Sequence, residues 1–161
     1  MKPIFCPLLI LLPLLAPLIP AKGAEIVRVQ PEFRTEESFH RILEFFTGRE
    51  HTGRREILRT DTDIREGFYL TARVRRADRK TFNQGTALLE LAMPEERETR
   101  AYEYSLESIE RRRPLVMFGV TGEEWPEDLA RPLAWKLTLL NAEGRELDSE
   151  QSFLWSMDEG D

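Results

Sequence analysis

Residues 67–76, Gly-Phe-Tyr-Leu-Thr-Ala-Arg-Val-Arg-Arg, alternate between apolar and more polar side chains along the whole stretch. In an extended chain, successive side chains point to opposite faces. One face here would be apolar and the other polar: Phe68, Leu70, Ala72 and Val74 share the first, and Tyr69, Thr71, Arg73 and Arg75 share the second. This period of two predicts a half-buried β-strand.

The same period returns in shorter segments, separated by turn-forming Gly, Pro, Asn and charged residues. Six or seven strands result, which predicts a mainly β, antiparallel sandwich. Over roughly residues 55–156 this layout resembles immunoglobulin-like and fibronectin type III-like domains, although the Cys…Trp…Cys pattern of true immunoglobulin domains is missing. The strands are expected at residues 67–76, 86–93, 100–106, 114–121, 133–140 and 146–155, with further candidates at 25–30, before Pro31, and at 55–60.

One segment near the start has a helical period instead. Thr35 is a suitable N-cap, and Gly48 a suitable C-terminal stop. The apolar residues between them recur at helical spacing and form one stripe: Phe39, Ile42, Leu43 and Phe46. We therefore expect one N-terminal amphipathic helix over residues 36–47. Its stripe either covers the sheet or docks a partner, and covering is favoured because a face this apolar is rarely left bare.

The first 23 residues predict a secretory signal peptide. Met1-Lys2 is followed by an uncharged, leucine-rich run from Pro3 to Ala21 and then by small residues. A retained membrane anchor is the alternative, since a span needs about 20 apolar residues. Three interior prolines and the absence of a basic stop-transfer cluster favour cleavage, after Gly23 or at the neighbouring Ala21 or Ala24. The sequence therefore predicts an exported protein, periplasmic or extracellular, with a single domain over residues 24–161.

Composition narrows the partners of this mature chain. Of the 23 basic residues, Lys2 and Lys22 leave with the signal, so 21 basic residues remain against 29 acidic ones and the net charge is −8. This balance gives no electrostatic reason to bind nucleic acid, or a membrane after signal cleavage. The Arg111-Arg112-Arg113 triplet is interpreted as a solvated turn. Cys6 is the one cysteine, so the mature chain has neither a disulfide nor a cysteine nucleophile.

Two loops contain residues capable of chemistry. His51 lies in a glycine-flanked loop beside Glu50, and a histidine next to a carboxylate can act as a general base. No convincing nucleophile accompanies it, so a structured loop is the preferred interpretation. Asp61 and Asp63 offer oxygen ligands for Ca²⁺, but Arg65 stands where an EF-hand pattern needs a third Asp or Asn. A tight turn, in which Asp side chains accept hydrogen bonds from nearby amides, is favoured there.

Trp125 differs from the other two tryptophans, which belong to alternating strands. It lies in a loop before Pro126 and is the best candidate for an exposed aromatic, as in a sugar-binding platform, or else a plug at the end of the sandwich. No catalytic, metal or cofactor site is predicted.

The leading hypothesis is therefore a non-enzymatic interaction module of the cell envelope. It would bind another envelope protein, or less favourably a glycan, through loops 49–54, 61–66 and 121–132. The candidate binding residues are His51, Asp61, Asp63 and Trp125. Two alternatives remain: a small extracytoplasmic hydrolase using His51 with nearby carboxylates, and a structural subunit of an envelope assembly.

Overall fold

A computed structural model describes residues 23–77, 79–94, 96–107, 109, 114–126 and 131–158 of the chain. The predicted signal peptide lies outside the described residues apart from Gly23, and so does the Arg111-Arg112-Arg113 triplet. Among the described residues, no helix has the length and hydrophobicity needed to cross a membrane.

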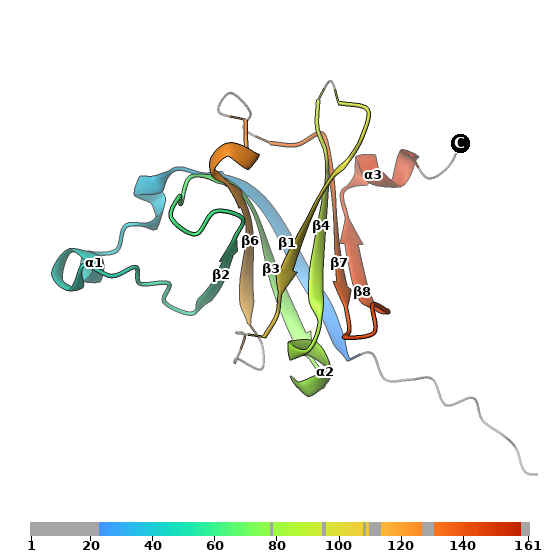
Figure 1. Cartoon of the computed structure of the whole chain (residues 1–161), viewed down its shortest axis with the longest axis horizontal. Helices are drawn as coiled ribbons and strands as arrows, with labels where there is room; N and C mark the ends of the chain where they lie inside the picture. The colour runs from blue at the N-terminus through green and yellow to red at the C-terminus, as the bar shows by residue number, and fades with distance from the viewer. Residues whose placement is uncertain are drawn as a thin grey trace, which may run out of the picture.

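The described chain is mainly β and contains two sheets of four strands each (Figure 1). Sheet A has the order β1 (Ala24–Arg34), β3 (Gly67–Arg76), β6 (Leu115–Thr121) and β2 (Arg55–Arg59). Sheet B has the order β5 (Arg100–Ser105), β4 (Thr86–Ala92), β7 (Ala134–Leu140) and β8 (Glu146–Gln151). The period-two segments of the sequence thus form strands, and residues 67–76 form one over the full predicted length.

The inner faces of the two sheets enclose one apolar core. Its fully buried members from sheet A are Phe68, Leu70, Ala72, Val74, Val116, Phe118 and Val120, and those from sheet B are Ala87, Leu89, Leu91, Leu137 and Leu139. Burial of each large side chain contributes about 1.5–3 kcal/mol, so this core is the main source of stability. The short helix α2 (Arg79–Asn83), which the sequence did not predict, adds the fully buried Phe82 to the same core.

Three strand predictions need correction. The expected antiparallel pattern fails at β2, which pairs with β6 in parallel at the edge of sheet A. The first strand does not end before Pro31 but continues to Arg34. β1 is the edge strand of sheet A, so one of its sides faces no neighbouring strand. A proline is tolerated on that side, because its missing amide hydrogen removes no hydrogen bond between strands.

The last predicted strand, 146–155, is also too long. β8 ends at Gln151, and the helix α3 (Phe153–Asp158) follows. The pairing with β7 explains why β8 ends at Gln151. Ser152 closes the pairing by donating its amide to the carbonyl of Trp135 at 2.9 Å, and β7 begins only one residue earlier, at Ala134.

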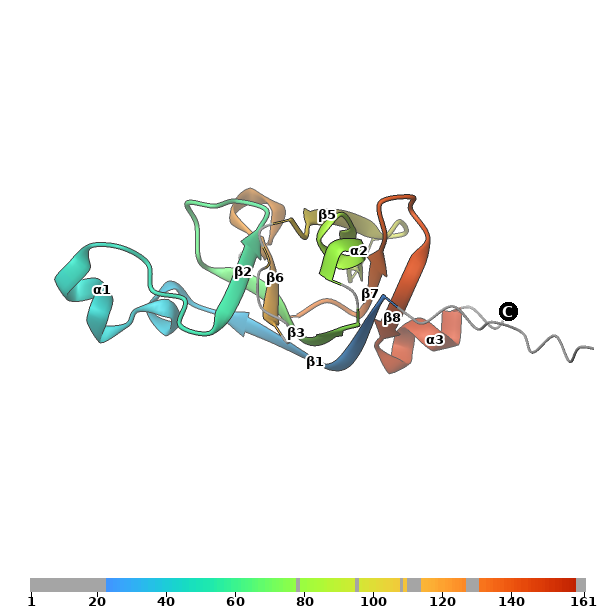
Figure 2. The same ribbon diagram turned by 90° about the horizontal axis from the view of Figure 1, so that it is seen from below.

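The predicted helix over residues 36–47 is wrong. The structure has a single 3-10 turn, η1 (Glu36–Phe39), and a separate six-residue helix, α1 (Ile42–Thr47), because His40 and Arg41 are extended between them. Of the expected stripe only Phe39 is buried. Figures 1 and 2 show α1 standing away from both sheets, so it does not cover the core. Isolated helices this short are marginal in water, and one anchoring phenylalanine decides the path of the segment.

Phe39 packs on the outer face of sheet A, where a second, smaller core lies. It contacts the fully buried ring of Tyr69 at a centroid distance of 5.0 Å, with Met117 and Ile57 beside it. The Tyr69 ring needs the space above its cross-strand partner Gly119, where an added Cβ would lie 2.3 Å from Tyr69 Cε1. Central strand β3 is therefore buried on both faces around Tyr69, whereas Arg73 and Arg75 on its outer face are exposed.

We predict that Gly119→Ala displaces the Tyr69 ring and lowers the free energy of unfolding by about 1–3 kcal/mol, the range for overpacking. Urea unfolding of the variant followed by circular dichroism measures this loss. The same substitution in a Tyr69→Ala background should cost much less, because the ring is gone. An equal cost in both backgrounds would contradict the proposed contact.

Candidate functional site

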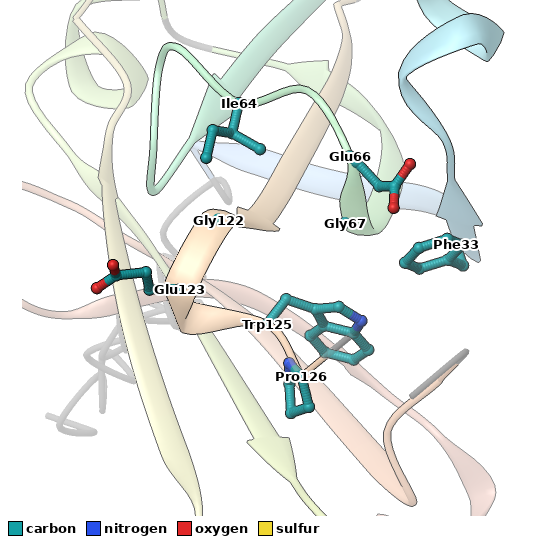
Figure 3. Close-up of a pocket in the computed structure, with 8 residues that line it drawn as sticks. All are labelled: Phe33, Ile64, Glu66, Gly67, Gly122, Glu123, Trp125 and Pro126. Carbon is teal, nitrogen blue, oxygen red and sulfur yellow. The ribbon is translucent and has the colours of Figure 1, made fainter. Parts of the chain in front are cut away.

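A hollow lies at the end of the molecule where β3 begins and β6 ends (Figure 3). It has a volume of about 550 Å³. The loop before β3 and the η2 turn (Gly122–Glu124) form its sides, and the end of β1 contributes Phe33. Its lining residues are Phe33, Ile64, Glu66, Gly67, Gly122, Glu123, Trp125 and Pro126. We call this space the end hollow.

Hydrogen bonds hold the two loops of the end hollow together. The Thr121 hydroxyl donates to the Asp61 carbonyl at 3.0 Å and accepts from the Asp61 amide at 3.1 Å. The Thr60 hydroxyl in turn accepts from the Thr121 amide at 2.9 Å. Gly122 allows this approach because it adopts a left-handed conformation, with φ of 65°, and a Cβ there would lie 2.9 Å from Asp61 Oδ2.

A further set of contacts fixes the η2 turn to sheet B. The Glu124 carbonyl accepts hydrogen bonds from Arg100 Nη1 at 3.0 Å and from the Tyr102 hydroxyl at 3.4 Å, and Arg100 is paired with Glu96. Both walls of the end hollow are thus attached to strands, which gives the hollow a defined shape before any ligand binds. Preorganisation of this kind reduces the entropic cost of binding.

Trp125 is buried, contrary to the expected exposed position. Only 6% of its surface is accessible, and its ring stacks on Phe68 at a centroid distance of 5.0 Å and an interplanar angle of 16°. The tryptophan therefore plugs the end of the core, as the second interpretation of the sequence held, and also lines the end hollow. Because one ring face already stacks on Phe68, Trp125 is not an open platform for a sugar.

The polar character of the end hollow comes from carboxylates. Figure 3 shows the Glu66 carboxylate beside the Phe33 ring, whereas the Glu123 side chain points away from Trp125 on the far side of the η2 turn. Glu66 also accepts the Glu36 amide hydrogen at 3.4 Å. The hollow thus combines two aromatic rings with a carboxylate at its mouth, a setting suited to an apolar side chain with a basic neighbour.

The other sequence-predicted residues lie in different places. Asp61 forms a tight turn, since its Oδ1 accepts the amide hydrogens of Asp63 at 2.9 Å and Ile64 at 3.3 Å. It borders the end hollow through Gly122, while Asp63 is exposed. In the described part of the chain, no group of three or more His, Cys, Asp or Glu side chains is placed to hold a metal ion.

His51 lines a small hollow that neither of these aspartates borders. It lies in the segment after α1, and its amide donates to Glu44 Oε1 at 3.1 Å. Its sequence neighbour Glu50 forms a two-pronged ion pair with Arg59, at 2.6 and 2.9 Å. The carboxylate that the sequence offered as a partner for His51 is therefore held by an arginine, and loop 49–54 lies apart from the end hollow.

That ion pair belongs to a network that fixes residues 35–54, which we call the arm, to the outer face of sheet A. Arg59 Nε donates to the Tyr69 hydroxyl at 2.8 Å, and this hydroxyl donates to the Arg65 carbonyl at 2.7 Å. The Arg59 guanidinium also lies 5.1 Å from the centre of the Phe39 ring. Hydrogen bonds from Arg59 lower the pKa of Glu50, and burial raises the pKa of Tyr69.

Sequence reasoning missed Phe33 and Glu66 in the end hollow. Phe33 follows Pro31, where the predicted strand stopped, and its continued alternation with Glu32 and Arg34 was the available signal. Glu66 carries no local pattern and becomes part of the hollow only through the fold.

Comparisons with protein-family models, with curated proteins and with solved structures gave no match to this chain. No family is therefore assigned, and the geometry of the chain itself supports the functional interpretation.

We predict that Glu50→Gln loosens the arm and lowers the free energy of unfolding by about 1–2 kcal/mol at pH 7, because a half-buried arginine loses its charged partner. Glu143→Gln is the matched control: its pair with Arg145 spans 3.7 Å and is exposed, so its loss should have little effect.

The cost of Glu50→Gln should also depend on pH. Since Arg59 holds the pKa of Glu50 below its ordinary value of 4.5, the carboxylate stabilises the folded chain above that value. This contribution is lost as the pH falls through the lowered pKa. Urea unfolding at pH 7 and at pH 3 should therefore show the difference between wild type and Glu50→Gln shrinking at the acidic pH. A difference that stays constant would contradict the ion pair.

Proposed function

We propose that this protein is a non-enzymatic binding module of the cell envelope and that the end hollow receives a protein partner. One observation carries the proposal: two of the three loops expected to mediate recognition, 61–66 and 121–132, line one preformed hollow, the second through its described residues 122–126. The aromatic rings of Phe33 and Trp125 would accept an apolar side chain. The Glu66 carboxylate would pair with a basic residue beside it.

The same features favour a protein over a glycan. Sugars stack on open aromatic faces, and the stacked, largely buried ring of Trp125 offers little of one. An extended peptide with alternating side chains fits better, because one of its side chains can enter a hollow while its neighbours contact the rim.

We further propose that the two sheets form an immunoglobulin-like sandwich. In such domains, strands A, B, E and D form one sheet, and strands C, F and G, extended by C′, form the other. The observed orders, β1-β3-β6-β2 and β5-β4-β7-β8, support this assignment, with β2 at the D position although it precedes β3 in the chain. An experimental structure in which β2 pairs with a strand other than β6 would contradict it.

The binding proposal is tested by site-specific crosslinking in cells. A photoreactive phenylalanine derivative replaces Ile64 at the end hollow or Glu143 in the β7–β8 turn, at the opposite end of sheet B (Figure 1). Irradiation should yield a discrete adduct from position 64 and none from 143. Adding Glu66→Lys should reduce the adduct at position 64 about tenfold, because a like charge would face the basic residue of the partner.

Equal adducts from both positions, or none from position 64 in a protein that is present and folded, would contradict a binding role for the end hollow. An adduct at position 64 that Glu66→Lys leaves unchanged would contradict the proposed basic partner residue.

Export is proposed from the order of charge, apolar run and small residues at the start of the chain. The mass of the protein recovered from the extracytoplasmic fraction should correspond to a chain beginning at or near Ala24. Replacing Leu11 and Leu12 by arginine should retain the chain in the cytoplasm, because charges interrupt the apolar run. A wild-type protein found in the cytosol with residues 1–23 still attached would contradict this prediction.

A further inference from the structure

The outer face of sheet A carries a row of arginines that runs across all four strands. The strand register places Arg28 of β1 opposite Arg73 of β3, Arg73 opposite Leu115 of β6, and Leu115 opposite Arg55 of β2. We call Arg28, Arg73 and Arg55 the arginine row. These residues line a groove of about 220 Å³ together with Gln30, Thr71 and Arg34.

The charge of this row is not balanced within the described chain. Glu32 is the one carboxylate that lines the groove, and it is engaged with Arg34 at 2.9 Å and with the Thr71 hydroxyl at 3.1 Å. None of the three arginines of the row forms an ion pair with another described residue. Like charges directly opposite each other on neighbouring strands are destabilising, so this row has a cost that an anion would offset.

Arg41 of the arm lies close to the arginine row. Burial, together with the positive charges of Arg34 and Arg41, lowers the pKa of Arg55. Arg41 and Arg55 also border one small hollow beside Phe39. Arg41 therefore lies next to the arginine row, in a hollow that Glu50, the ion-pair partner of Arg59, also lines.

The arm presents a set of exposed apolar side chains beside this basic surface. Phe45 is 88% exposed, Ile42 85%, Phe46 76% and Leu43 47%, and we call these four residues the apolar knob. The two phenylalanine rings contact each other edge to face at 5.6 Å. Glu44 accepts hydrogen bonds from Arg65 at 2.8 Å and from the His51 amide, so the knob is held in place.

Arg41 connects the two features. It precedes the knob in sequence, shares one hollow with Phe45 and shares the other with Arg55 of the arginine row. The arginine row thus lies to one side of the projecting apolar knob. This combination of positive charge and exposed aromatic rings matches the chemistry of a bilayer interface. There the anionic headgroups lie at the surface and the apolar region lies about 5–10 Å below it.

We propose that the arginine row and the apolar knob together form a docking surface for a bilayer containing anionic phospholipids. Phe45 and Phe46 enter the headgroup region while Arg28, Arg55 and Arg73 contact phosphate groups. The negative net charge of the whole chain does not oppose this, because the attraction acts over about 10 Å at 0.1 M salt and the arginines are local to the surface. The proposal concerns another face than the end hollow and stands independently of its partner.

The arrangement favours a bilayer over two other occupants. A nucleic acid would use the arginines but leave Ile42 and Phe45 in water, whereas a second copy of this chain would cover the knob but bring two arginine rows of like charge together. A bilayer, whose surface is anionic and whose interior is apolar, satisfies both features.

Vesicle co-sedimentation tests the proposal. Residues 23–161 are used, because every described core residue lies from Ala24 onward and the apolar leader would itself bind lipid. The probes are vesicles of phosphatidylcholine alone and vesicles with a third of phosphatidylglycerol, at 50 mM and 300 mM salt. We expect binding only to the anionic vesicles, and weaker binding at the higher salt.

Two double variants separate the contribution of the apolar knob to vesicle binding from that of the arginine row. Phe45→Ser with Phe46→Ser should abolish detectable binding, since the inserted apolar area is lost. Arg55→Gln with Arg73→Gln should weaken binding by about fivefold for each arginine removed. The matched controls are Phe153→Ser with Leu154→Ser, an exposed apolar pair on α3, and Arg145→Gln, an exposed arginine in the β7–β8 turn. These controls should bind as the wild type does, and circular dichroism checks that all variants fold.

Equal binding to both kinds of vesicle, or equal losses in the controls, would overturn the proposal. So would a knob-dependent dimer, detected by sedimentation velocity, that binds no vesicles, because the second copy would then be the occupant. Binding of a duplex oligonucleotide that requires Arg55 and Arg73 but not Phe45 would assign the row to nucleic acid and would also overturn it.

Discussion

Burial of the first part of strand β3 on both faces, around Tyr69, is the constraint on which the rest of the structure depends. Its inner side chains, from Phe68 to Val74, pack against sheet B, while Tyr69 on its outer face carries the second core. A strand in this position needs apolar residues inward and one large amphipathic residue outward. Tyr69 meets that need, because its ring packs on Phe39 and its hydroxyl both accepts from Arg59 and donates to Arg65.

The two faces of this strand position the two proposed binding surfaces. The inner core ends at Trp125, whose stacking on Phe68 closes the core and at the same time builds the wall of the end hollow. The outer core ends at Phe39, beyond which the arm leaves the sheet and exposes Phe45 and Phe46. A single strand thus connects the packing that stabilises the protein with both proposed binding surfaces.

The arm shows how side-chain anchoring can override helical periodicity. Its sequence has the spacing of an amphipathic helix, yet a continuous helix would require the whole stripe to lie on sheet A. Of the predicted stripe, the outer face accepts only Phe39, which packs with Tyr69, Met117 and Ile57, because Arg55 and Arg59 flank Ile57 on β2. The chain therefore extends at His40 and Arg41, and the remaining apolar residues become a surface feature.

The sequence by itself determined the mainly β class and the limits of most strands, because a period of two in a half-buried strand is a local property that needs no knowledge of neighbours. It also identified two of the loops that line the end hollow, since Gly122 and the Asp61 turn are readable as breaks in the chain. Register and packing are not local, and only the tertiary structure decided what depends on them. Arg28, Arg55 and Arg73 are far apart in sequence and form a row only because four strands align, and Trp125 is buried only because Phe68 lies beneath it.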